Sequence, residues 1–314
     1  MNEILDRWRE YLLASYKSDH TIRSYLLAGR QFFECAKEKG FDPLVLDRKA
    51  TFVYLAFLSQ KYTSKATIMQ RRDGVKQLYR FMVGDKFVKQ NPFALIDRMK
   101  VEQKPPKFLS QDEAAKLLDS IAINPALTAT IYGRNEYDRH HEGEFLAIRD
   151  KALLELLYSC GTRSQETANL NWMEVDFRAG FIRVNNGKGG KDRIAPIGEL
   201  ALTALWNYGI AYREYFDMEP SGKNPIFQSR RQMRLTTRSI QRAVNLRLKL
   251  AGIDTTMSTH GLRHSFATHM MQNGAGIVEI AKCLGHVNLS TTTRYTQITM
   301  NDVLGNYDRA HSRA

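Results

Sequence analysis

The residues best suited to chemistry lie near the C-terminal end of the sequence, where histidine, arginine and tyrosine occur close together. His260 and Arg263 stand three positions apart, so a helix would present both on one face. His286 follows a Leu-Gly pair, and Tyr295 follows a run rich in serine and threonine. An arginine binds phosphate through two hydrogen bonds, a histidine exchanges protons near neutral pH, and a tyrosine hydroxyl can attack phosphorus. Together they are components of a phosphoryl-transfer site.

Two further candidates, Arg163 and Lys188, lie upstream of this stretch. Arg163 follows a buried helical pattern and has two interpretations: it forms a structural ion pair with Glu166, or it binds an anion. Lys188 lies in the Asn- and Gly-rich tip of a predicted hairpin, residues 185–192, from which a mobile lysine could reach a substrate. Each of these residues taken alone is more often structural, but their joint occurrence favours a shared site.

The composition is that of a globular protein with a polyanionic partner. The 314 residues suffice for two domains with separate cores, and 43% of them are hydrophobic. The net charge of +13 points most simply to nucleic acid. No apolar run approaches the roughly 18 residues needed to cross a bilayer, and the first residues lack a signal-peptide pattern. We therefore expect a cytoplasmic protein with no membrane partner.

The cysteines and the one histidine pair do not suggest a metal site. Cys35, Cys160 and Cys283 are widely spaced within apolar helical patterns, so we interpret them as small core residues. The adjacent His140-His141 has no cysteine or carboxylate at ligand spacing and is interpreted as a surface pair. We expect no metal, no cofactor and a reducing compartment.

The patterning predicts two domains. Residues 1–102 contain four amphipathic helical patterns, the second of which is predicted to begin at Thr21. Residues 103–108 form a polar linker whose Pro105-Pro106 pair prevents a helix. Directly after it, Ser110 to Glu113 matches a capping box, which begins the second domain, residues 109–314.

The second domain is predicted to mix helices with a small sheet. Residues 124–144 are polar and without periodicity, and we interpret them as a flexible insertion; helical patterning resumes at Phe145 and stops at Gly161. Three short strands are then expected, at Trp172–Asp176, Phe181–Val184 and Arg193–Ile197, before helices resume. The fold class is therefore mainly α with a small antiparallel β-sheet.

Four segments together resemble the signature regions of tyrosine recombinases, most closely those of the Xer-like subgroup. They are Tyr158–Glu166, Gly187–Arg193, His260–His269, and Leu284-Gly285-His286 through Tyr295. The resemblance covers the second domain from about Leu109 to the end. It implies a four-helix, SAM-like core-binding domain that clamps DNA, followed by an α+β catalytic domain.

The resemblance also implies a phosphate cradle. Arg163 and Arg263 would clamp the non-bridging oxygens of the scissile phosphate, while His260 and His286 would form hydrogen bonds and exchange protons around it. Glu166 would orient Arg163. Pre-placed cations of this kind stabilise the charge of the transition state without a metal.

The same resemblance assigns the nucleophile and the general acid. Tyr295 would attack phosphorus, giving a 3′-phosphotyrosyl link, and Lys188 would protonate the leaving 5′ oxygen. The energy of the broken phosphodiester is kept in the phosphotyrosine, so resealing by a partner strand needs no ATP. His264 and His269 are expected in packing or supporting roles.

Other basic residues are candidates for DNA contacts beyond the site. The first group surrounds the hydroxyl-rich start of the fourth predicted helix, and the second lies in the basic run that precedes an amphipathic helix. The candidates are Lys65, Arg71, Arg72, Arg230, Arg231, Arg234, Thr236 and Arg238.

The expected partner is a double-stranded DNA recombination site, bound as two copies by a homotetramer or by a heterotetramer with a related recombinase. The tail beginning at Met300 is expected to dock on a neighbouring protomer, with folding back onto its own domain as the alternative. Within the family, resolution of chromosome or plasmid dimers is favoured, and an integrase or resolvase of a mobile element is the alternative. A type IB topoisomerase and a non-catalytic DNA-binding protein are more distant alternatives.

Overall fold

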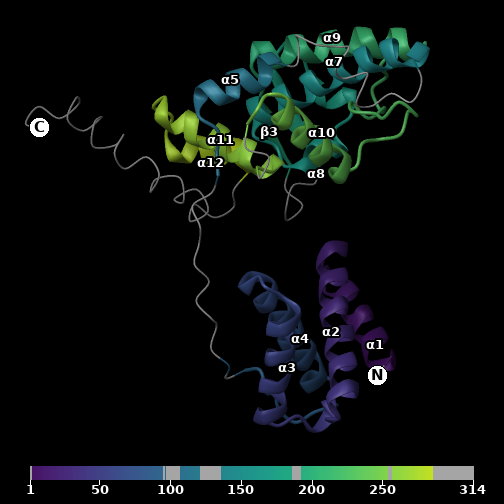
Figure 1. Ribbon diagram of the computed structural model, residues 1–314, viewed down its shortest axis with the longest axis vertical. Helices are drawn as coiled ribbons and strands as arrows, with labels where there is room; N and C mark the ends of the chain where they lie inside the picture. Colours follow the sequence, from purple (N-terminus) through teal and green to yellow (C-terminus); the bar gives the residue numbers. More distant parts are fainter. Residues whose placement is uncertain are drawn as a thin grey trace, which may run out of the picture. The chain divides into compact units, whose positions relative to one another are not determined.

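A computed structural model describes residues 2–94, 96, 107–120, 136–185, 192–253 and 257–285, with side chains in the 136–185 segment from residue 142 onward. The chain divides into two compact units, residues 1–104 and 105–314 (Figure 1). Each has its own hydrophobic core. Within the described parts of the chain, no helix has the length and apolar content required to cross a membrane.

The first unit is helical. The start of its second helix lies slightly before the predicted Thr21, because Ser18 caps the helix and its hydroxyl accepts a hydrogen bond from the Thr21 amide at 3.3 Å. Gly40 ends this helix in the left-handed conformation with φ of 71°. The elements are α1 (Asn2–Ala14), α2 (Asp19–Lys39), the 3-10 helix η1 (Pro43–Val45), α3 (Arg48–Lys61) and α4 (Lys65–Gly84).

Aromatic side chains fill the core between these helices. The ring of Phe32 on α2 meets the rings of Tyr54 and Tyr79 edge to face, with centroids 5.0 Å and 5.6 Å away. Helices α2 and α4 approach closely because Gly74 lies against Ala28: a Cβ at position 74 would lie 2.6 Å from that of Ala28. The predicted helical character of this unit is therefore confirmed.

The second unit is built around one long helix. Its elements are α5 (Gln111–Asp119), α7 (Glu136–Cys160), α8 (Ser164–Asn169), the 3-10 helix η3 (Trp172–Glu174), β1 (Val175–Asp176), β2 (Phe181–Val184), β3 (Arg193–Pro196), α9 (Glu199–Phe216), α10 (Thr237–Leu250), α11 (Thr259–Gln272) and α12 (Ile277–Leu284). Helix α9 packs along α7 (Figure 1). The middle of α7 is buried on several sides by core side chains. The predicted capping box is present, with Ser110 and Glu113 each bonded to the other's backbone amide.

The predicted start of the long helix was wrong. Helix α7 begins at Glu136, so residues 136–144 are helical and not part of a flexible insertion. The buried carboxylate of Glu142 lies 2.6 Å from Arg230, 88 positions away in the sequence. That long-range ion pair has no signal in the local pattern. Residues 124–135 lie outside the described part of the chain.

The small sheet is antiparallel, in the order β1-β2-β3. The pairing of β2 with β3 places Val184 opposite Arg193, which makes Arg193 the first paired residue after the hairpin tip. The predicted first strand was partly wrong: Trp172–Glu174 is a 3-10 turn, fixed by a 2.7 Å hydrogen bond from the Asn171 amide to the Glu174 carboxylate. The predicted class, mainly α with a small antiparallel sheet, is confirmed.

Candidate active site

The site begins at the sharp reversal that follows α7. Gly161 has φ of 56°, and a Cβ there would lie 2.6 Å from Cδ1 of Phe266, so only glycine fits both the conformation and the space. The next residue, Thr162, is buried and its hydroxyl pairs with that of Thr167 at 2.7 Å. The reversal therefore places Arg163 at the entrance to α8, close to α11 and α12.

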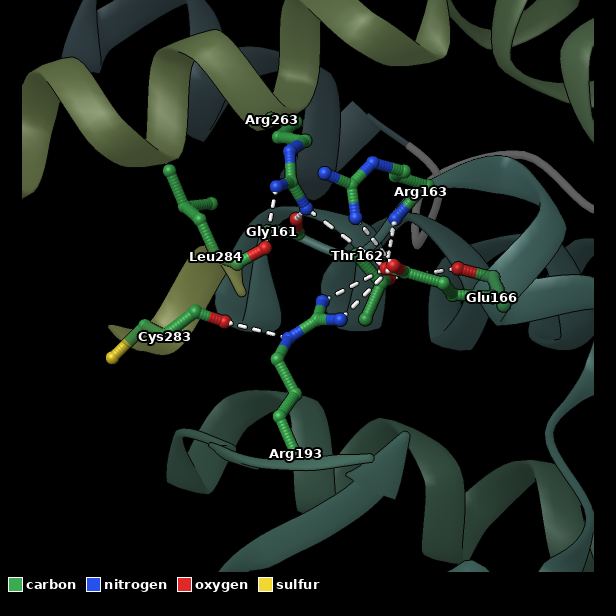
Figure 2. A network of polar contacts seen from close by, with 9 residues as sticks. Gly161, Thr162, Arg163, Glu166, Arg193, Arg263, Cys283 and Leu284 are labelled. Carbon is green, nitrogen blue, oxygen red and sulfur yellow. Dashed lines mark hydrogen bonds and ion pairs between the residues drawn. The ribbon is translucent and has the colours of Figure 1, made fainter. Parts of the chain in front are cut away.

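Glu166 is the centre of the polar network (Figure 2). One of its oxygens, Oε1, accepts from Arg163 Nη1 at 2.6 Å and from Arg193 Nη1 at 2.9 Å. The other, Oε2, accepts from the Arg163 amide and from Arg193 Nη2, both at 2.8 Å, and Arg263 Nη1 lies 3.9 Å away. Burial alone would raise the pKa of this carboxyl, but the hydrogen bonds and charge of Arg193, together with those of Arg163, lower the pKa to about 2.

The two predicted clamp arginines differ in exposure. Arg163 has a side chain 27% exposed, and of its hydrogen-bond donors only Nη1 and the backbone amide have partners within the described residues. Arg263 is 2% exposed and donates to two carbonyls, that of Gly161 from Nη1 and that of Leu284 from Nη2, both at 2.6 Å. These carbonyls fix the plane of the Arg263 guanidinium, and the Glu166 contact fixes that of Arg163.

His260 lies near the start of α11, one helical turn before Arg263. The helix start is tied to its neighbours, because Thr259 donates from its amide to Gln241 of α10 at 3.0 Å and its hydroxyl lies 2.6 Å from that of Ser164 on α8. His260 reaches solvent, yet neighbouring groups displace part of its hydration. This desolvation, followed by the charges of Arg263 and Arg163, lowers the pKa of His260. These effects favour the neutral form of the imidazole.

Three of the six predicted catalytic residues are thus brought together: Arg163, His260 and Arg263. The other three, Lys188, His286 and Tyr295, lie outside the described residues, as does the tail that begins at Met300. The predicted link from Glu166 to Arg163 corresponds to a direct contact, although the carboxylate holds more than that one arginine.

Arg193 is the residue that sequence reasoning missed. It lies in the second of the four resembling segments, but only Lys188 of that segment was taken as a candidate. Its guanidinium makes two hydrogen bonds to Glu166 and donates from Nε to the Cys283 carbonyl at 2.9 Å. The sequence held no clear signal for this role, because Arg193 precedes Ile194 on a short strand and its partners lie far away in the sequence.

The remaining histidines of α11 have the supporting roles expected of them. His269 is buried, and its Nε2 donates to the Leu109 carbonyl at 2.8 Å while Nδ1 lies 2.7 Å from the Tyr158 hydroxyl. Burial lowers the pKa of His269, which favours the neutral ring that this pattern requires. The ring of His264 packs edge to face on that of His260, with centroids 4.9 Å apart.

One predicted DNA contact in the first unit was wrong. Arg72 is 3% exposed, donates to the Ile96 carbonyl and lies 3.2 Å from Asp73, so it stabilises the unit and does not present its charge to solvent. Arg71 is half-buried and donates to the Ser24 carbonyl at 3.4 Å. Lys65 is exposed at the first turn of α4 and stays a candidate.

The candidate DNA contacts in the second unit also fall into two groups, those with structural partners and those exposed to solvent. Arg230 is paired with Glu142, and Arg234 donates to the Ala168 carbonyl at 2.8 Å and to the Asn171 side chain at 2.6 Å, so both have structural partners. Thr236 caps α10 through a 3.1 Å hydrogen bond from the Ser239 amide. The exposed side chains that stay candidates are those of Arg231 and Arg238.

No metal site is present among the described residues, which contain no group of three or more His, Cys, Asp or Glu side chains arranged to hold an ion. The three cysteines are free. Cys35 and Cys160 are buried as expected, and burial raises the pKa of the Cys160 thiol to about 12, whereas Cys283 is half-buried. The side chains of His140 and His141 lie outside the described ones.

Comparisons with known proteins show the family to which the chain belongs. Residues 107–302 match the model of the phage integrase family. The tyrosine recombinase XerC of Thermodesulfovibrio yellowstonii is 32% identical over 299 residues, which cover 94% of this chain and 91% of that protein. Among solved structures, XerA recombinase is 26% identical with a TM-score of 0.52, and the matched region covers 100% of this chain and 99% of that one.

A more distant structure supports the fold alone. The integrase of the Tn1549 transposon, solved with transposon right end DNA, is 17% identical with a TM-score of 0.68, over 98% of this chain and 99% of that one. The family match spans more than half of the sequence and includes every residue of the described cluster. The chain therefore belongs to the phage integrase family and is an Xer-like tyrosine recombinase, an enzyme of site-specific DNA recombination.

Proposed function

We propose that Arg163, His260 and Arg263 form the phosphate-binding part of the active site, and that Lys188, His286 and Tyr295 complete it. The observation that carries this proposal is the convergence of the Arg163 and Arg263 guanidinium groups on one carboxylate beside His260, whose pKa is lowered. Arg163 has donors directed away from Glu166, and the cluster carries excess positive charge. A phosphodiester is the substrate class that such a cluster fits best.

In the proposed reaction the Tyr295 oxygen forms a bond to phosphorus as the bond from phosphorus to the 5′ oxygen breaks. The Tyr295 proton leaves to a base, for which neutral His260 is suited, and Lys188 delivers a proton to the departing 5′ oxygen. Arg163 and Arg263 stabilise the charge that spreads over the non-bridging oxygens. A 5′ hydroxyl of the partner strand then attacks the phosphotyrosine, and the same steps run in reverse to reseal the DNA.

The biological role we propose is resolution of chromosome or plasmid dimers in the cytoplasm, which would contribute to chromosome partition. The similarity to XerC proteins over nearly the whole chain favours this role over integration or resolution of a mobile element. The active assembly would be a tetramer, of this chain alone or with a related recombinase, on two DNA sites. Residues 1–102 would clamp the duplex, 103–108 would link the domains, and 109–314 would catalyse the reaction.

The proposal is tested by replacing Tyr295 with phenylalanine. DNA covalently attached to the wild-type chain in cells is recovered and sequenced, and a nicked duplex of that sequence, which traps the cleaved product, is then supplied to purified protein. The wild type should form a covalent adduct that is resistant to detergent, and Tyr295→Phe should form none. An adduct with the variant, or none with the wild type, would overturn the assignment. Supercoil relaxation without a recombinant product would favour a topoisomerase instead.

A further inference from the structure

Arg193 connects three segments that are far apart in the sequence. It begins β3, five positions after Lys188, and its side chain is 10% exposed. Two of its nitrogens bind both oxygens of Glu166 on α8, and the third binds the carbonyl of Cys283 in the last turn of α12 (Figure 2). The hairpin base, the carboxylate that orients Arg163 and the end of α12 are thus joined through one guanidinium group.

The end of α12 is shaped around this side chain. Gly285 ends the helix with φ of 64°, and a Cβ at that position would lie 2.7 Å from Cδ of Arg193. Arg193 holds the Cys283 carbonyl, and Arg263 holds the carbonyl of Leu284. Carbonyls in the last turn of a helix have no partner within the helix, so these two arginines supply the missing donors. The backbone is therefore fixed directly before His286.

Arg193 also occupies half of the hydrogen-bond acceptor capacity of the Glu166 carboxylate. Glu166 accepts four hydrogen bonds, which matches the capacity of a carboxylate, and two of them come from Arg193. Only the planar fork of an arginine can bind both oxygens and reach the Cys283 carbonyl from Nε at the same time. A lysine at this position would keep the charge but lose that geometry.

We propose that Arg193 is a positioning residue for DNA cleavage, which holds Glu166 and the end of α12 in place and thereby orients Arg163 toward the phosphate. This inference rests on the proposed function of those residues. Arg193 itself contacts no substrate in the proposal. Its removal should slow the chemical step without weakening DNA binding, because Arg193 contacts Glu166 and the Cys283 carbonyl and not the DNA.

The alternative is that Arg193 serves stability alone, and the experiment separates the two roles. Full-length Arg193→Ala and Arg193→Lys are compared with Arg183→Ala, which removes an exposed arginine from the adjacent strand β2. Single-turnover cleavage is measured with saturating protein on a nicked duplex of the sequence recovered from wild-type adducts, and the DNA Kd is measured in parallel. Amide hydrogen exchange of residues 277–285 is measured on the free proteins.

Arg193→Ala should slow cleavage on the order of 100-fold, because a misplacement of about 1 Å has that effect, while the Kd changes less than about threefold. The fraction of DNA that is finally cleaved should stay at the wild-type level. Loss of folded protein would lower that fraction, whereas loss of positioning lowers only the rate constant of cleavage. Arg193→Lys, which keeps the charge and the fold, should still cleave about 10-fold slower than wild type. Exchange at the end of α12 should rise in both variants, whereas Arg183→Ala should match wild type in every measurement.

A second comparison identifies the route. If Arg193 acts through Glu166, the double variant Glu166→Gln with Arg193→Ala should cleave no more slowly than the slower single variant. Arg193 variants that cleave at the wild-type rate constant, or that lower only the fraction of DNA finally cleaved, would overturn the positioning role while leaving the proposed function intact. A wild type that forms no adduct would overturn both, and the exchange data would still report whether Arg193 holds the end of α12.

Discussion

Replacing Glu166 with glutamine tests whether the buried carboxylate stabilises the arginine cluster through its charge. Glutamine has nearly the same shape and keeps one acceptor oxygen, but it carries no negative charge. Arg193 and Arg263 are 10% and 2% exposed at the side chain, so both cations would stay buried after the substitution. Each of them would then face a neutral amide. The NH₂ group of that amide is a hydrogen-bond donor and cannot accept a hydrogen bond from a guanidinium N–H group.

The magnitude follows from the pKa of Glu166. Its pKa is lowered from 4.5 to about 2, and its side chain is only 5% exposed, so solvent screening is weak. Each pKa unit is equivalent to about 1.4 kcal/mol, so the ionised form contributes about 3 kcal/mol to stability. Because the folded-state pKa is the lower one, this contribution is complete above about pH 4.5 and is lost as the pH falls toward 2. Removal of one member of a buried ion pair has an effect of similar size.

The assay is urea-induced unfolding of the full chain with Trp8 replaced by phenylalanine in every protein compared, followed by the fluorescence of Trp172 and Trp206 in the second unit. At pH 7 the free energy of unfolding should be about 3 kcal/mol lower for Glu166→Gln than for wild type, and the difference should narrow between pH 4.5 and 3. Glu214→Gln, an exposed substitution on α9, is the control and should have no such effect. A difference at pH 7 below about 0.5 kcal/mol, or one that does not change with pH, would refute the reasoning.

Two further predictions concern the turn before Arg163 and the contacts with DNA. Gly161→Ala should destabilise the second unit by at least about 2 kcal/mol, because it adds strain at positive φ and a clash with Phe266. The control is Gly252→Ala, at φ of 66° with no atom closer than 3.9 Å, which should show the effect of the strain alone. Equal losses of stability for the two variants in thermal unfolding would contradict the clash. Arg238→Ala should lower the slope of log Kd against log salt by about 1, and Arg72→Met, which removes a buried charge, should lower stability and leave that slope unchanged. A change in the salt slope for Arg72→Met would show that Arg72 contacts DNA phosphate despite its burial.

Elements with a local cause could be predicted from the sequence. The capping box at Ser110, the left-handed stop at Gly161 and the strand Phe181–Val184 each depend on residues a few positions apart. The start of α7 could not be predicted, because its polar first turns gain a partner, Arg230, only after the chain folds. The 3-10 turn at Trp172–Glu174 was mistaken for a strand: besides the local bond between Asn171 and Glu174, its amides bond to the backbone of Gly222 and Asn224, which lie far along the chain.

The site shows the same division between local and distant causes. The pairing of Arg163 with Glu166 is a contact between residues three positions apart, and sequence spacing indicated it. Arg193 is 27 positions from Glu166 and 90 from Cys283, and neither distance follows a helical or strand period. The burial of Arg72 is also a tertiary effect, since its neighbours in sequence resemble an exposed basic helix start. Only packing separates the buried arginines from the exposed ones.

The balance of charge in the cluster gives a physical reason for the buried carboxylate. Three guanidinium groups converge on Glu166, and without it three positive charges would be held at close range in a partly desolvated space. With Glu166 the cluster carries a net charge of +2, while a phosphodiester carries one negative charge in the ground state and more on its oxygens in the proposed transition state. The positive charge that remains in the cluster is therefore compensated more fully in the transition state than in the bound substrate. An interaction that is stronger in the transition state than in the ground state lowers the activation barrier. Since Arg193 supplies two of the four hydrogen bonds to Glu166 and binds both of its oxygens, it offsets part of that negative charge, so that in the proposed site Arg163 and Arg263 keep positive charge for the phosphate.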